Sequence, residues 1–183
     1  FNIPNYTIDT IFFGGGTPSL IRPNYIKQII EKAFSLWRAD KKYTEITLET
    51  NPSSVETHDL KEFMQAGINR FSIGIQSLDD SSLKFLGRVH NVEEALRVLK
   101  HACNICDNVS ADFIYALPKD TLCSWKKNLI KIEQLINETD LKHISLYQLT
   151  IEENTQFAKA VANDDWQPLG NTMQSKIYRE THK

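Results

Sequence analysis

The sequence predicts an α/β fold in which parallel strands form a sheet and helices lie outside it. Stretches that suit buried strands alternate with stretches that repeat apolar residues at helical spacing. This alternation occurs five times with a period of about 25 to 35 residues, which is typical of a parallel sheet. A complete eightfold barrel usually takes about 250 residues, so the 183 residues of this chain suit either part of a barrel or a doubly wound sheet.

Residues 10–13 form the first predicted strand, because four apolar or β-branched residues are bounded by glycines. Pro23 suits a first helical position, and apolar residues follow it at helical spacing up to Trp37. Residues 45–51 alternate as a strand that stops at Pro52.

Ser53 followed by Glu56 predicts a capping box for the next helix, and Gly67 predicts its end. Residues 70–76 then read as a strand. A short helical turn is expected before Gly87.

Asn91 and Glu94 predict a second capping box. Residues 109–117 read as a strand, residues 122–136 as an amphipathic helix, and residues 143–152 as the last strand. A weakly patterned helical segment and a further helical stretch follow.

The composition argues against several functional classes of protein. The net charge is −2, from 21 basic and 23 acidic residues without a run of one sign, which argues against a nucleic-acid partner. No apolar run is long enough for a transmembrane segment. Three cysteines suit a reducing compartment, so we expect a cytoplasmic protein. The absence of an initial Met suggests a fragment.

The three glycines that follow the first strand predict a turn that faces a ligand, because a bare backbone can approach where a Cβ would clash. The spacing matches neither a Walker A loop nor the dinucleotide-binding glycines. A plain tight turn between a strand and a helix is the alternative.

Polar residues stand at the ends of the strands that follow. Glu49, Gln76 and Asp112 lie on polar registers near those ends, and Arg88 follows in a loop. Each alone could cap a helix or carry a solvated charge. Together they would suit a small zwitterion with hydroxyl groups, since Arg clamps a carboxylate and carboxylates accept from ammonium or ribose.

No motif predicts a metal site or a catalytic nucleophile. Cys103 and Cys106 form a C-x-x-C, but no second pair stands at zinc spacing and Cys123 does not complete a site. The five histidines are scattered. The catalytic residues are therefore unknown.

The ordered motifs resemble those of the radical S-adenosylmethionine (SAM) proteins related to oxygen-independent coproporphyrinogen III oxidase. The residues of two of these motifs are more similar to those of the HemW-type haem chaperone branch of that family. The match extends to about Phe157. The motifs are Phe13-Gly-Gly-Gly-Thr-Pro-Ser19, Glu49-Thr-Asn-Pro52, Ser72-Ile-Gly-Ile-Gln-Ser77, Leu86-Gly-Arg-Val-His90, Asp112-Phe-Ile-Tyr-Ala-Leu-Pro118 and Ile144-Ser-Leu-Tyr-Gln-Leu-Thr-Ile-Glu152.

The resemblance implies a partial TIM barrel of six parallel strands, of which this chain would hold the second to the sixth. Residues 1–157 would then be a radical SAM core without its first strand and cluster loop, and residues 158–183 the start of a carboxyl-terminal region. The fold would thus be truncated at both ends.

The resemblance also implies two cofactors, SAM and a [4Fe-4S] cluster whose ligands lie outside this chain. The strand around Thr150 would lie near the adenosine. The residues that would bind SAM are Gly15, Gly16, Thr17, Glu49, Gln76, Arg88 and Asp112. Such a cluster needs three thiolates, and the three cysteines here have the wrong spacing, so this chain alone is expected to be inactive. Ala116 stands where the family commonly has Gly.

By this resemblance the intact protein would be a haem chaperone that carries haem and delivers it to haem-accepting proteins. An oxygen-independent coproporphyrinogen III oxidase, acting by radical oxidative decarboxylation in porphyrin synthesis, is one alternative. An inactive fragment is the other.

Overall fold

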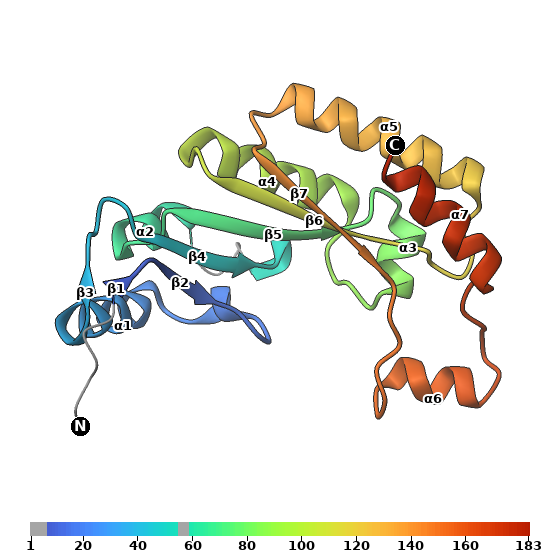
Figure 1. Cartoon of the computed structure of the whole chain (residues 1–183), viewed down its shortest axis with the longest axis horizontal. Helices are drawn as coiled ribbons and strands as arrows, with labels where there is room; N and C mark the ends of the chain where they lie inside the picture. Colours follow the sequence, from blue (N-terminus) through green and yellow to red (C-terminus); the bar gives the residue numbers. More distant parts are fainter. Residues whose placement is uncertain (1–6, 55–58) are drawn as a thin grey trace.

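Five parallel strands form one sheet whose order follows the sequence (Figure 1). The computed structural model describes residues 7–54 and 59–183. A doubly wound sheet reverses its strand order at a switch point, whereas this order is that of a barrel wall, so the predicted partial barrel is confirmed over the doubly wound alternative. The strands are β2 (Thr10–Phe13), β4 (Glu45–Thr50), β5 (Arg70–Gln76), β6 (Val109–Tyr115) and β7 (His143–Gln148).

A second, very small sheet was not predicted. It pairs β1 (Thr7–Ile8) with β3 (Arg38–Ala39) in parallel. Strands of two residues are too short to show an alternating pattern, so sequence periodicity could not reveal them.

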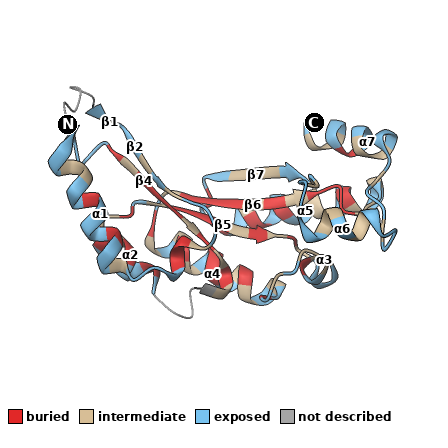
Figure 2. Cartoon of the chain, turned by 90° about the horizontal axis from the view of Figure 1, so that it is seen from below, coloured by how far each residue is buried: buried red, intermediate tan, exposed pale blue. Residues whose placement is uncertain are grey.

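Helices cover one face of the sheet. Figure 2 shows α1, α2 and α4 on the same side of the strands. No helix in the described part of the chain is long and apolar enough to cross a membrane. The helices are α1 (Pro23–Leu36), α2 (Leu60–Ala66), α3 (Asp80–Phe85), α4 (Val92–Ile105), α5 (Leu122–Glu138), α6 (Gln156–Ala162) and α7 (Asn171–Thr181), with 3₁₀ turns at Pro18–Leu20 and Pro52–Ser54.

The two faces of the sheet differ in polarity because side chains alternate along each strand. Leu48, Phe71 and Phe113 point to the helices and are buried. On the opposite face Glu49 is the register partner of Ser72, and Asp112 that of Ser145. The apolar face forms the core, and the polar face carries the candidate site.

Two of the predicted helix boundaries are confirmed. The Asn91 side chain accepts from the Glu94 N–H, and the Glu94 carboxylate accepts from the Asn91 N–H, both at 2.9 Å. Gly67 ends α2 in a left-handed conformation, with a φ of 112°. The capping box at Ser53 and Glu56 cannot be compared, because Glu56 lies outside the described residues. The described helix α2 begins at Leu60 with Asp59 as its N-cap.

Replacing Gly67 with alanine is expected to reduce the free energy of unfolding by about 1–3 kcal/mol, because a side chain at this φ is strained. The added Cβ would also lie 3.3 Å from Cδ1 of Ile30. Denaturant unfolding measures the change. Gly170→Ala is the matched control, since Gly170 has a φ of −63° and open space around it. Equal effects of the two substitutions would contradict this account.

Helices beyond the sheet are held by aromatic side chains. Trp125 of α5 packs against Tyr115 with ring centroids 5.3 Å apart and planes tilted by 36°, and its Nε1–H donates to Thr181 Oγ1 of α7 at 2.8 Å. Phe157 and Trp166 pack on Phe85 of α3. Aromatic pairs of this kind contribute about 0.5–1.5 kcal/mol each beyond the area they bury.

Candidate functional site

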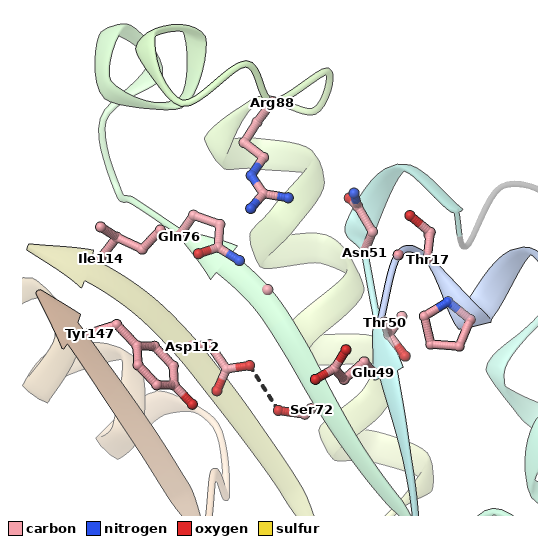
Figure 3. Close-up of a pocket in the computed structure, with 13 residues that line it drawn as sticks. Thr17, Glu49, Thr50, Asn51, Ser72, Gln76, Arg88, Asp112, Ile114 and Tyr147 are labelled. Atoms are coloured by element: carbon pink, nitrogen blue, oxygen red, sulfur yellow. Dashed lines mark hydrogen bonds between the residues drawn. The ribbon is translucent and has the colours of Figure 1, made fainter. Parts of the chain in front are cut away.

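A cavity of about 310 Å³ opens at the carboxyl ends of the strands, on the polar face of the sheet (Figure 3). It contains six of the seven residues predicted to bind a ligand, namely Gly16, Thr17, Glu49, Gln76, Arg88 and Asp112. The structure therefore brings together residues that are far apart in the sequence, from the turn after β2, from β4, β5 and β6, and from the loop after α3.

The seventh residue, Gly15, touches this group through its backbone. Its N–H donates to Oε2 of Glu49 at 3.0 Å, which fixes the carboxylate beside the glycine turn. Gly15 and Gly16 have φ values of 82° and 60°, a conformation that favours glycine. A Cβ at Gly14 would lie 2.7 Å from Cε1 of Phe12, so the exposed Phe12 ring would have to move to accommodate a side chain there.

Hydrogen bonds orient the Asp112 carboxylate. Ser72 Oγ donates to Oδ2 of Asp112 at 2.8 Å, as Figure 3 shows. Ser110 Oγ donates to the other oxygen at 3.4 Å and also lies 2.9 Å from Nδ1 of His143. The carboxylate thus keeps one orientation toward the cavity.

Gln76 reaches the cavity because the strand is irregular at its end. The register of β5 against β6 shifts between Ile73 and Gln76, and Gln76 has a φ of 68°. Its side chain lies over Gly74, where a Cβ would be 2.5 Å from the Gln76 Nε2. A bulge of this kind re-aims a side chain at a strand end, and here it directs a carboxamide at the cavity.

Arg88 supplies the cation of the cavity. The guanidinium is directed into the cavity from the loop after α3 (Figure 3). Its Nε is buried and has no hydrogen-bond partner in the part of the chain that the structure describes. Burial lowers the pKa of the guanidinium from its ordinary value, yet Arg remains charged near neutral pH. A half-buried cation without a partner suits an anionic ligand group such as a carboxylate.

Sequence reasoning missed several cavity residues. Ser72 and Ile114 could have been found, because each alternates with a predicted residue on the same strand face. Tyr147 stands in the predicted strand 143–152, but nothing in the sequence pattern indicated that its side chain lines a cavity. The resemblance placed the strand around Thr150 near the adenosine. Tyr147 of β7 lines the cavity, whereas Thr150 does not, and the Thr150 hydroxyl donates to the Gln148 carbonyl. The residues not predicted are Pro18, Thr50, Asn51, Ser72, Gly74, Ile114 and Tyr147.

Ala116 shows why its position favours glycine. It is buried and has a φ of 61°, a left-handed conformation that costs free energy for a residue with a Cβ. The strand end at Tyr115 is followed directly by this residue. The chain therefore carries local backbone strain at the end of β6.

The cysteines are not arranged as a metal site. Cys103 and Cys106 lie at the end of α4 and Cys123 at the start of α5, and none lines the cavity. Burial raises the pKa of both the Cys103 and the Cys106 thiol, which disfavours the thiolate that binds metal. Among residues 7–54 and 59–183 no group of three potential metal ligands is found.

The parallel partial barrel, with a polar cavity at the carboxyl ends of its strands, places the protein among the barrel proteins that bind ligands at that edge of the sheet. The sequence pattern of the Radical SAM superfamily matches residues 2–130, and the chain belongs to this superfamily. This confirms the resemblance noted in the sequence.

Within the superfamily the chain is similar to two groups of proteins. It is 40% identical over 173 residues to the mitochondrial radical S-adenosyl methionine domain-containing protein 1 of Danio rerio, covering 94% of this chain and 38% of the relative. It is 39% identical over 153 residues to the heme chaperone HemW of Escherichia coli, covering 82% of this chain and 39% of the relative. The chain thus spans about two fifths of the length of these relatives.

Solved structures support the fold. Coproporphyrinogen III oxidase (HemN) from Escherichia coli matches with a TM-score of 0.77 over 96% of this chain and 39% of that protein, at 22% identity. An archaeal Elp3 from Methanocaldococcus infernus matches with a TM-score of 0.75 at 18% identity. At these identities the agreement concerns the fold alone.

Proposed function

We propose that the full-length protein containing this chain is a HemW-like haem chaperone, which binds haem and delivers it to haem-accepting proteins. The observation that carries the proposal is the similarity to bacterial proteins named heme chaperone HemW. The HemN match supports the fold and not an oxidase activity, because its sequence identity is low.

We propose that SAM binds in the cavity at the strand ends. Two features of the chain fit this ligand: the partnerless Nε of Arg88, which suits its carboxylate, and the glycine turn, whose open backbone can approach it. When bound, SAM supplies an electrophilic sulfonium group. The proposed ligand residues are Gly15, Gly16, Thr17, Glu49, Gln76, Arg88 and Asp112.

Each proposed ligand residue has a role that follows from its chemistry. The backbone of the glycine turn and Thr17 would hold the methionine end, with Glu49 accepting from its ammonium group. Asp112 is suited to accept from ribose hydroxyls, and Gln76 can both donate and accept. Glu49 and Asp112 carry the two negative charges that balance an ammonium and a sulfonium.

We propose that the full-length protein holds a [4Fe-4S] cluster whose thiolates come from residues outside this chain. Cys103, Cys106 and Cys123 do not fit the role, since they lie away from the cavity. The residues 1–157 and 158–183 remain our proposed division into core and carboxyl-terminal region.

We propose a cytoplasmic location by analogy with the bacterial relatives. Some relatives are named as mitochondrial, which makes the mitochondrion the alternative. Cell fractionation with an antibody against the full-length protein separates the two. Recovery of the protein with the mitochondrial fraction would overturn the cytoplasmic proposal.

The haem proposal is tested by titrating the full-length protein with haem while following the Soret absorption. A saturable spectral change, followed by transfer of the haem to a haem-free acceptor protein, is expected. No saturable binding would overturn the proposal. Carbon dioxide and 5′-deoxyadenosine released from coproporphyrinogen III under anaerobic, reducing conditions would instead assign the oxidase.

A further inference from the structure

We infer that an aromatic cluster, formed by Phe85, Phe157 and Trp166, positions the Arg88 guanidinium in the cavity. The three residues belong to α3, to α6 and to the loop before α7. None of them lines the cavity, so they are positioning residues that act through Arg88. The inference rests on the proposed binding of SAM in this cavity.

The cluster is closed, since each ring contacts the other two. Phe85 stacks on Phe157 with centroids 5.1 Å apart and planes at 21°. Trp166 meets both rings edge-on, with centroids 5.0 Å from Phe85 and 5.4 Å from Phe157. Offset-stacked and edge-to-face arrangements are the favourable geometries for aromatic pairs. The cluster therefore fastens α6 and the following loop to α3, below which α6 lies in Figure 1.

The end of α3 is connected to Arg88 by a short, hydrogen-bonded turn. Phe85 is the last residue of α3, three positions before Arg88. The N–H of Arg88 donates to the Leu83 carbonyl at 2.9 Å, and that of Gly87 donates to the Lys84 carbonyl at 3.1 Å. A movement of this helix end therefore moves the backbone of Arg88 with it.

The helix α3 needs tertiary contacts to keep its place. It has six residues, and helices this short are marginal without packing. Leu83 is buried and holds it from the side of the core. The aromatic cluster holds its carboxyl-terminal turn.

Arg88 depends on this placement because its buried Nε has no hydrogen-bond partner among the described residues. The backbone position of Arg88 therefore decides where its guanidinium lies. Loosening the cluster should weaken the contact of Arg88 with a ligand carboxylate. It should leave contacts with the nucleoside part of the ligand unchanged.

The test measures the binding of two probes to the full-length protein by titration calorimetry. S-Adenosylhomocysteine carries the carboxylate, and 5′-methylthioadenosine lacks it. Trp166→Ala is expected to weaken S-adenosylhomocysteine binding about fivefold, within the range of coupling between residues in one network. The affinity for 5′-methylthioadenosine should stay unchanged. In an Arg88→Ala background, Trp166→Ala should have no further effect.

Two further variants serve as controls, and a third repeats the test. Trp166→Phe keeps a ring in the cluster and should retain most of the affinity. Trp37→Ala removes an exposed tryptophan outside the cluster and should change neither affinity. Phe157→Leu is the second cluster variant should Trp166→Ala fail to fold, as judged by circular dichroism, and the same selective loss is expected for it.

The outcomes separate the inference from the proposed function. If the unaltered protein binds neither probe, the proposed SAM site is wrong and the inference falls with it. The inference alone is overturned if the unaltered protein binds both probes but the cluster variants reduce the affinity for both equally. It is also overturned if a cluster substitution reduces the affinity further in the Arg88→Ala background. Unchanged affinities in the folded cluster variants would overturn it as well.

Discussion

Replacing Trp125 with alanine is expected to lower the free energy of unfolding by about 3–5 kcal/mol, the usual cost of removing a large aromatic side chain from a core. Only 2% of Trp125 is exposed. It packs against Tyr115 of β6 and donates to Thr181 of α7, so it joins the sheet to two helices. Denaturant unfolding, followed by circular dichroism, measures the loss.

Trp37→Ala is the control for this prediction. Trp37 is 36% exposed and follows the last residue of α1, so its removal leaves a smaller cavity and should cost clearly less. If Trp125→Ala and Trp37→Ala shifted the unfolding midpoint by the same amount, Trp125 would not hold the helices in the way described here.

Replacing Arg88 with alanine in the full-length protein should weaken S-adenosylhomocysteine binding by about 1–3 kcal/mol, the worth of a hydrogen bond to a charged group. The guanidinium points into the cavity with an unpartnered Nε, and its loss would leave the ligand carboxylate without a counter-charge. Titration calorimetry gives the change in affinity. Arg88→Lys should recover part of it, because Lys keeps the charge but loses the planar fork.

Arg97→Ala is the matched control for Arg88→Ala. Arg97 lies on α4 and lines a separate cavity beside Val89 and His90. Both substitutions remove one positive charge, so a general electrostatic effect would weaken binding in both variants alike. A loss confined to Arg88→Ala assigns the effect to the cavity, whereas equal losses would remove Arg88 from the proposed site.

The main elements of the fold could be predicted because local patterns determine them. Asn91 and Glu94 form the expected capping box, and Gly67 ends its helix in the expected left-handed conformation. The last strand was predicted to continue to Glu152 but ends at Gln148. Alternating residues predict a strand, but hydrogen bonding to a neighbour decides where it stops.

The cavity could be predicted in part, because the carboxyl ends of parallel strands meet at one edge. This reasoning located Glu49, Gln76 and Asp112 correctly around one cavity. It could not predict the register shift that turns Gln76, nor the Ser72 hydrogen bond to Asp112. Both depend on how neighbouring strands align, which periodicity within one strand does not encode.

The aromatic cluster could not be predicted from the sequence. Phe85 is separated from Phe157 and Trp166 by the whole of α4, β6, α5 and β7. No spacing rule relates residues this far apart. Their contact follows from the path of the chain after β7, which sequence patterns left undefined.

A crystal structure of the full-length protein with bound S-adenosylhomocysteine would decide whether the cavity is the ligand site. We expect density for the ligand across the glycine turn, with its carboxylate at Arg88 and its ribose at Asp112. Density in another place, such as the cavity beside His90 and Arg97, would contradict the assignment of the site.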